Sequence, residues 1–163
     1  MKVLEKIPQM DDNELSRLFA NVIDLISRRK QVEQALVVKK AVQVEWEKRL
    51  DAFNKGNYKA DTPEIGILKM IGYRVGNDGI PEQKRRILID YVLSEILPPV
   101  GSPAYMAEWG EPETAERYRK AHRVIRVLAS SAKTIGNQEK AAAEWEADLE
   151  YMEQAWGHLK YVD

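Results

Sequence analysis

Few side chains in this chain could do acid–base, nucleophilic or metal chemistry. It has two histidines and no cysteine, which excludes thiolate catalysis, disulfides and cysteine-based zinc sites. Neither His122 nor His158 has a glutamate three residues before it, as the ligand motif of a di-iron helical bundle would require. No serine lies in the Gly-x-Ser-x-Gly context of a nucleophile elbow. We therefore predict a protein that is not an enzyme, with no catalytic residue and no cofactor.

Paired carboxylates are the remaining groups that could hold a metal ion. Glu144 and Asp148 lie four residues apart, as do Glu146 and Glu150, so each pair shares one face of a predicted helix. Two carboxylates bind a hard cation only if another segment supplies further oxygen ligands. A solvated helix face is the simpler interpretation, and we predict no metal site. A metal-dependent hydrolase with carboxylate ligands stays open as an alternative function.

Two neighbouring stretches near the C-terminus carry opposite charge. Residues 114–135 hold six basic residues and one acidic residue, whereas residues 137–163 hold seven acidic and two basic residues. Both stretches place apolar residues at steps of three and four, which is the pattern of an amphipathic helix. Gly136 and Asn137 supply a turn between them. A short connection makes the two helices antiparallel neighbours, so we predict a long C-terminal helical hairpin with a basic and an acidic helix.

This division of charge has two interpretations. In the first, the charges pair across the hairpin or face water, and each exposed pair contributes about 0–1 kcal/mol. In the second, the basic helix binds an anionic partner, because clustered Lys and Arg side chains bind phosphates or acidic protein surfaces. The candidate surface combines arginines of the basic helix with a basic triplet from the middle of the chain: Arg119, Arg123, Arg126, Lys84, Arg85 and Arg86.

The rest of the chain also shows helical periodicity, interrupted by proline and glycine. A helix follows Asp11-Asp12-Asn13, and a second is predicted from about Val32 to Phe53, although valines at 37–44 raise a strand alternative. Short helices are predicted at 63–73 and 103–109, where a proline follows a Thr or Ser cap. Another helix begins at Pro81 and ends before Pro98.

Tyr105 and Trp109 stand out in the central part of the chain. They lie four residues apart and would share one face of the predicted helix at 103–109. Aromatic residues at this spacing usually belong to a core. The alternative is a contact patch for a partner, because Trp, Tyr and Arg are favoured interface anchors. We keep both residues as a candidate aromatic contact.

These segments predict an all-α protein. We expect one domain over residues 1–163 with six or seven helices, including two short central helices and the C-terminal antiparallel hairpin. A softer division is possible near residues 54–62, after the N-terminal helix pair. No hairpin of strands and no internal repeat is indicated. The expected core combines apolar and aromatic residues from the helical stripes: Leu18, Phe19, Val22, Trp46, Leu50, Ile87, Tyr91, Tyr118, Ile125, Leu128, Trp145, Leu149 and Met152.

Part of the sequence resembles a known kind of domain. Four features occur in a fixed order: the sequence YRVG, a basic helix, the sequence LPPVGSPAYMAEWGEP, and a long helix that ends near DLEYM. This arrangement is similar to an uncharacterised all-helical domain of bacterial and phage proteins, over roughly residues 65–157. The resemblance implies a bacterial or phage origin. It implies no activity and assigns no functional residue.

The bulk composition narrows the function further. The net charge of the 163 residues is −1, so no global field attracts nucleic acid or an anionic membrane. No apolar run approaches the length of about 20 residues that spans a bilayer, and the N-terminus lacks the apolar core of a signal peptide. We predict a cytoplasmic protein with no membrane partner.

The leading function is a non-enzymatic interaction or regulatory module that meets a protein partner through charged helical surfaces. The main alternative is a nucleic-acid-binding protein that uses the basic face of helix 114–135. Helical stripes of this kind pack equally well within one chain or between two chains. The oligomeric state therefore stays open.

Overall fold

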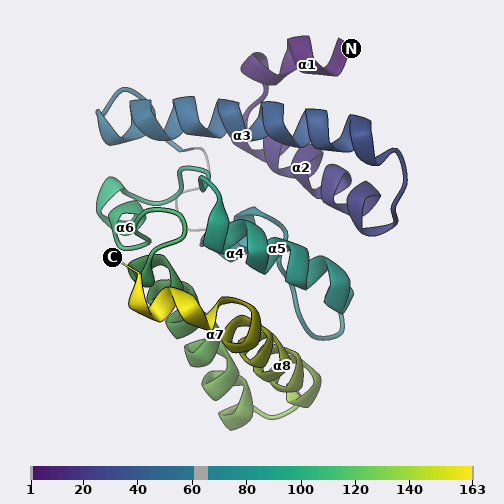
Figure 1. Ribbon diagram of the computed structural model, residues 1–163, viewed down its shortest axis with the longest axis vertical. Coiled ribbons are helices and arrows are strands. Elements are labelled where there is room, and N and C mark those ends of the chain that lie inside the picture. Colours follow the sequence, from purple (N-terminus) through teal and green to yellow (C-terminus); the bar gives the residue numbers. More distant parts are fainter. Residues whose placement is uncertain (1, 61–65, 163) are drawn as a thin grey trace. The chain divides into compact units, whose positions relative to one another are not determined.

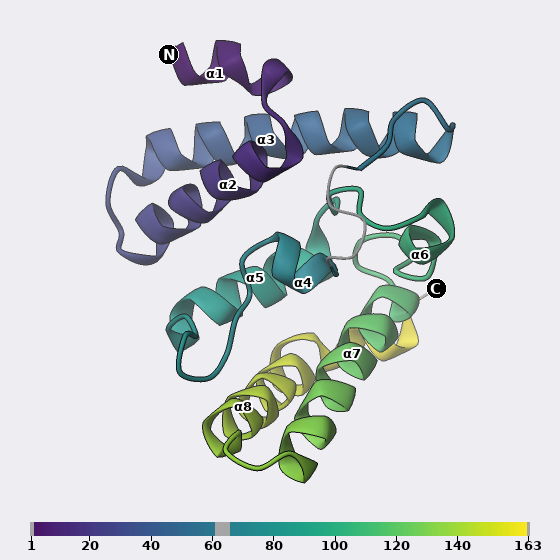
Figure 2. The same cartoon turned by 180° about the vertical axis from the view of Figure 1, so that it is seen from behind.

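The computed structural model describes residues 2–60 and 66–162, and the regular structure of these residues is entirely helical (Figures 1 and 2). This confirms the all-α prediction. The described residues form eight α-helices and two short 3-10 helices, which exceeds the predicted six or seven helices. The additional helix is α1 (Lys2–Lys6), which is joined to the 3-10 helix η1 (Ile7–Gln9). None of the described helices combines the length and the apolar character that crossing a membrane demands.

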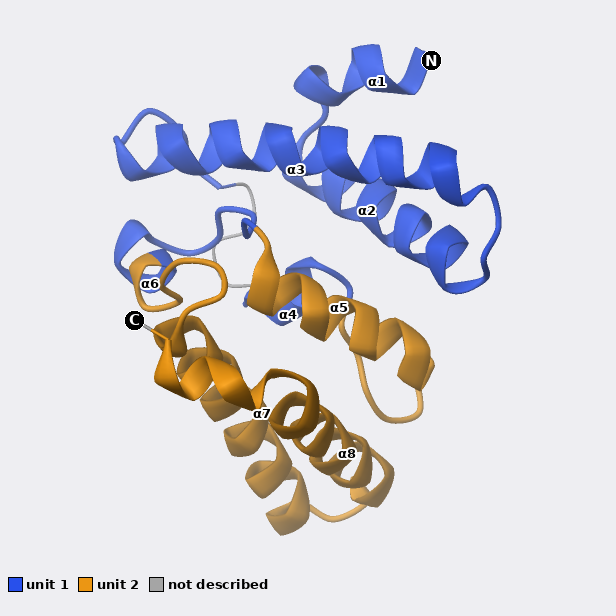
Figure 3. Ribbon diagram, viewed as in Figure 1, with its two compact units in different colours: residues 1–72, 96–106 blue, residues 73–95, 107–163 orange. Residues whose placement is uncertain are grey.

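The chain divides into two compact units (Figure 3). Unit 1 comprises residues 1–72 and 96–106, and unit 2 comprises residues 73–95 and 107–163. Each unit is therefore assembled from two separate stretches of sequence. The softer division near residues 54–62 falls inside unit 1.

A pair of antiparallel helices, α2 (Asp12–Ser27) and α3 (Val32–Asn54), forms the main body of unit 1 (Figures 1 and 2). Asp11 begins α2 with a capping box: its side chain accepts from the Glu14 amide at 2.7 Å, and Glu14 accepts from the Asp11 amide at 2.8 Å. Phe19 and Trp46 are fully buried, with ring centroids 4.9 Å apart. The strand alternative for 37–44 is wrong, because these residues continue the buried helical stripe of Val38, Val42 and Trp46.

A buried polar cluster fixes the start of α2 against α3. The Arg49 guanidinium donates to Asp12 Oδ1 at 3.2 Å and to Glu45 at 2.9 Å. The Tyr58 hydroxyl donates to the same Asp12 oxygen at 2.7 Å. Burial and the adjacent Asp12 carboxylate together raise the pKa of Tyr58 to about 12. The neutral phenol is therefore the form that the folded state favours.

Because the folded state raises the pKa of Tyr58, stability is expected to fall in alkali. The contribution is fully present below the ordinary tyrosine pKa of about 10 and is lost as pH rises towards about 12. Tyr58→Phe should flatten the decline of unfolding free energy across this pH window, as measured by urea unfolding at stepped pH. Tyr161→Phe, at a side chain that is 88% exposed, is the control. Identical pH profiles for wild type and Tyr58→Phe would contradict this assignment.

The rest of unit 1 comprises residues 66–72 and the second stretch, residues 96–106. The predicted cap at Thr62-Pro63 lies outside the described residues, and the described helix there is α4 (Ile67–Met70). Residues 96–106 add the loop Leu97–Val100, which is buried, and the start of α6 (Pro103–Ala107). The Ile67 amide donates to the Tyr105 hydroxyl at 3.4 Å, and this bond ties the two stretches of unit 1 together.

Unit 2 contains α5 (Glu82–Ser94), α7 (Ala115–Thr134), α8 (Glu139–Trp156) and the 3-10 helix η2 (Gly157–Tyr161). The predicted C-terminal hairpin is confirmed: α7 and α8 pack along their length (Figures 1 and 2). Thr114 caps α7 by accepting from the Arg117 amide at 3.2 Å.

Most of the expected core residues are buried, but some of them are exposed or only partly buried. Leu128 is the clear error at 36% exposure, because the buried side of α7 passes through Ala121, Ile125, Ala129 and Ala132 instead. Residues of the expected core that are fully buried are Phe19, Val22, Trp46, Tyr91, Tyr118, Ile125 and Met152. Those that are only partly buried are Leu18, Leu50, Ile87, Trp145 and Leu149.

Candidate functional site

Two of the acids of α8 point into unit 2 rather than to solvent. Asp148 is 1% exposed, and its Oδ2 accepts from Arg85 Nε at 2.8 Å and from the Tyr73 hydroxyl. Glu144 accepts from Arg85 Nη1 at 2.6 Å and from the Gly76 amide at 3.1 Å. Glu144 and Asp148 therefore bind α5 and the segment before it, and they do not form an open acidic face.

The same contacts correct the prediction that Arg85 belongs to the candidate surface for an anionic partner. Arg85 is 4% exposed and is held between two carboxylates of α8, so it does not present its charge to a partner. Arg86 is exposed, but it pairs with Glu82 at 2.6 Å and lies 4.8 Å from the centre of the Tyr151 ring. Lys84 is half-buried. Arg85 and Arg86 thus face α8 and do not extend the arginines of α7.

A second arginine counted as part of the basic helix is also buried. Arg117 is 3% exposed and donates to carbonyl oxygens at the end of α5, Val92 at 2.6 Å and Glu95 at 2.8 Å. It also donates to Trp109 O at 2.9 Å and Gly110 O at 3.0 Å. Burial lowers the pKa of Arg117 to about 10. This cation therefore closes the negative end of α5 and fixes the loop before α7.

Several of the remaining charges pair across or beside the hairpin. His122 Nε2 lies 3.0 Å from Glu153, and Lys133 pairs with Glu146. Lys120 pairs with Glu108 at 2.7 Å, and this ion pair, helped by the more distant Arg123, lowers the pKa of Glu108. The interpretation of mutual neutralisation therefore describes part of the hairpin.

Three arginines of α7 are the exception. Arg119, Arg123 and Arg126 are all exposed, and none makes an ion pair with a residue that the structure describes. They follow each other at steps of four and three on a regular helix, so they lie on one face. We call these three residues the basic surface. Val127, which follows Arg123 by four residues, is 55% exposed beside them.

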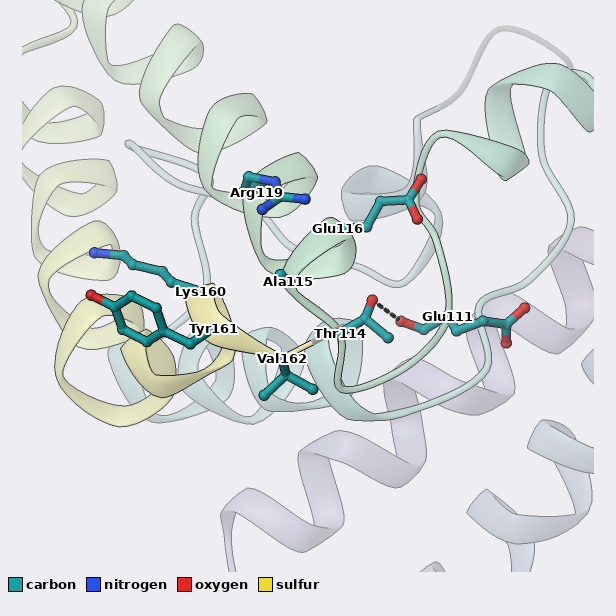
Figure 4. Close-up of a pocket in the computed structure, with 8 residues that line it drawn as sticks. All are labelled: Glu111, Thr114, Ala115, Glu116, Arg119, Lys160, Tyr161 and Val162. Atoms are coloured by element: carbon teal, nitrogen blue, oxygen red, sulfur yellow. Dashed lines mark hydrogen bonds between the residues drawn. The ribbon is translucent and has the colours of Figure 1, made fainter.

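Two pockets meet at Arg119. One, of about 390 Å³, is lined by Glu108, Glu116, Arg119, Lys120 and Arg123. The other, of about 460 Å³, lies where the chain end returns to the start of α7, because the Ala115 amide donates to Val162 O at 2.8 Å. Figure 4 shows its residues: the carboxylates of Glu111 and Glu116 point to one side, and Lys160 and Tyr161 to the other.

Lys160 and Tyr161 were not predicted as site residues. They follow the last long helix in η2. Contacts between η2 and α7 bring them beside Arg119, including the hydrogen bond between Ala115 and Val162 and the approach of Lys160 Nζ to within 5.7 Å of the centre of the Tyr118 ring. Tyr161 is 88% exposed. No local sequence pattern announces this juxtaposition, because the two segments are separated by the whole hairpin.

The candidate aromatic contact does not form as predicted. Helix α6 ends at Ala107, so Tyr105 and Trp109 do not share a helix face. Tyr105 is half-buried and bonded to the Ile67 amide, and Trp109 is 1% exposed with Lys120 Nζ 5.7 Å from its ring centre. Trp109 is a core residue, as aromatic residues at this spacing usually are.

No cluster of three or more His, Cys, Asp or Glu side chains among the described residues could hold a metal ion. The described residues form an all-helical fold in which α7 presents three exposed arginines that make no ion pair with a described residue. No family model, curated protein or solved structure matches the chain. The resemblance to a helical domain of bacterial and phage proteins stays a prediction.

Proposed function

We propose that this protein is a non-enzymatic interaction module that binds an acidic segment of a partner protein through the basic surface. The observation that supports the proposal is the set of three exposed arginines on one side of α7 that lack an ion pair with a described residue. The other Lys and Arg side chains of α7 are buried or form ion pairs, so these three arginines are the cations of α7 available to a partner.

The surroundings of the basic surface favour a protein over a phosphate backbone. Glu108 and Glu116 line the same pocket as Arg119 and Arg123, so the positive charge is interrupted there. Such a surface fits a segment whose carboxylates are spaced by neutral residues better than a continuous run of phosphates. Exposed Val127 and Tyr161 lie on the same helix or at the neighbouring pocket. Arg with Tyr and an apolar neighbour is typical of the residues that carry binding energy in protein interfaces.

Charge reversal at the centre of the surface tests the proposal. Arg123→Glu is expected to weaken binding of a labelled acidic peptide about tenfold, or about 1.4 kcal/mol, in fluorescence anisotropy at low salt. Lys69→Glu makes the same charge change at an exposed residue of α4 in unit 1 and should leave binding unchanged. No binding by wild type, or equal losses in both variants, would overturn the proposal.

A nucleic-acid backbone is the second candidate, and the missing ion pairs of the three arginines are the observation that favours it. In this case labelled DNA or RNA would bind more tightly than the acidic peptide. Loss of one phosphate contact in Arg123→Glu should weaken binding to all sequences alike and reduce the salt slope by about one. Binding of the peptide without binding of nucleic acid would reject this candidate.

A further inference from the structure

A different surface, on α3 in unit 1, carries exposed apolar residues. Leu36, Val37 and Val44 are 48%, 49% and 38% exposed, although α1 and η1 also contact this helix. Valine is a poor helix former at an exposed position, because its β-branched side chain loses rotamer freedom there. Val37 and Val44 therefore weaken the isolated helix without contributing a full contact inside the chain.

The two valines belong to a regular stripe. Glu33, Val37, Lys40, Val44 and Lys48 follow each other at steps of four, three, four and four, so they lie along one side of α3. Glu33, Lys40 and Lys48 are exposed, and none makes an ion pair with a described residue. We call these five residues the α3 stripe.

The α3 stripe of one copy is complementary to the α3 stripe of a second copy that runs in the opposite direction. If two copies of α3 pack antiparallel about a two-fold axis between residues 40 and 41, Val37 lies opposite Val44 of the partner. Glu33 then lies opposite the partner's Lys48, and Lys40 lies opposite the partner's small Ala41. The charged contact and the apolar contact are each formed twice, as an isologous interface requires.

Other alignments of the same stripe are unfavourable. Parallel pairing places each residue opposite its own copy, which brings Glu33 against Glu33 and Lys40 against Lys40. Shifting the antiparallel alignment by one position places Glu33 opposite Glu47, and Lys40 opposite itself. Like charges in these positions oppose association, whereas the alignment about residues 40 and 41 joins the valines and pairs Glu33 with the partner's Lys48.

From this complementarity we propose that the protein forms a homodimer through antiparallel pairing of the α3 stripe. A single pair of helices buries less surface than a standard permanent interface of about 1,600 Å². The dimer is therefore a weak one that depends on protein concentration and on salt. The proposal does not involve the basic surface, which lies on α7 in unit 2. It can therefore be tested independently of the proposed function.

Sedimentation velocity over a range of concentrations, at about 50 mM salt, tests the proposal through a charge swap. Glu33→Lys and Lys48→Glu each place like charges together twice and should raise the dissociation constant about tenfold. The double variant Glu33→Lys/Lys48→Glu restores opposite charges and should return to within about twofold of wild type. Lys69→Glu is the matched control and should behave as wild type.

A gain-of-association variant completes the experiment. Lys40 lies next to the two-fold axis, where its charge approaches the charge of the partner's Lys40. Lys40→Leu removes this repulsion and adds apolar area, so it should tighten the dimer about tenfold. Wild type that stays monomeric up to about millimolar concentration would overturn the proposal, and so would self-association that the two single charge reversals leave unchanged.

Discussion

Replacement of Arg85 by methionine is expected to lower the free energy of unfolding by about 3–5 kcal/mol. The Arg85 guanidinium is the cation that compensates the fully buried Asp148, at 2.8 Å, and Glu144, at 2.6 Å. Methionine fills a similar volume but leaves the Asp148 carboxylate buried among few donors. Urea unfolding followed by circular dichroism measures the loss.

Two further variants separate the effect of the buried charge from a general effect of losing an arginine. Arg126→Met, on the exposed side of α7, should change stability by less than about 0.5 kcal/mol. Arg85→Met combined with Asp148→Leu removes the cation and its fully buried partner and should recover at least half of the loss. The remaining Glu144 side chain is 17% exposed and still accepts from the Gly76 amide. A double variant that is less stable than Arg85→Met alone would contradict this explanation.

Arg117→Met is expected to cost about 2–4 kcal/mol of unfolding free energy. Four backbone carbonyls accept from the Arg117 side chain, and two of them belong to the end of α5. A methionine satisfies none of these acceptors. It does remove the cost of burying a cation, a cost that shows in the pKa of Arg117, which burial lowers to about 10. The balance is a net loss, because unsatisfied buried carbonyls are expensive.

The neighbouring arginine supplies the control for this prediction. Arg119→Met changes an exposed residue two positions along the same helix and should have little effect on stability. Arg117→Lys keeps the charge but cannot reproduce the planar fork of donors, so it should remain clearly destabilised. Hydrogen exchange should report the damage locally, at the Glu113 amide that donates to Leu93 O at 2.8 Å. Equal stability of the two methionine variants would contradict the role of Arg117.

These two arginines show where sequence reasoning reached its limit. Arg85 precedes Leu88, Ile89 and Val92 at steps that place it on the buried side of α5, and Arg117 likewise leads the buried side of α7 with Ala121 and Ile125. The periodicity of the neighbours therefore contained a signal. Counting charge along a stretch of sequence ignored it, so Arg85 was assigned to the candidate surface and Arg117 was counted only as one base of the basic helix.

The hairpin itself was predictable because its determinants are local. Capping at Thr114, the turn at Gly136 and Asn137, and stripes at steps of three and four act within a few residues. The basic surface was predictable for the same reason, since spacing alone places Arg119, Arg123 and Arg126 on one face. The position of Lys160 was not predictable, because it depends on contacts between η2 and α7 that are distant in sequence, such as those with Tyr118 and between Ala115 and Val162.

The interleaving of the two units in sequence has a consequence for the order of events during synthesis. Unit 1 needs residues 96–106, and unit 2 needs residues 73–95 together with the C-terminal hairpin. Helix α5 therefore emerges well before α7 and α8, and Arg85 stays without Asp148 until α8 has been made. Because domains fold as the chain becomes available, unit 1 is expected to fold first. The apolar side of α5 remains exposed during this time. A chaperone that binds nascent chains is therefore expected to bind during this period.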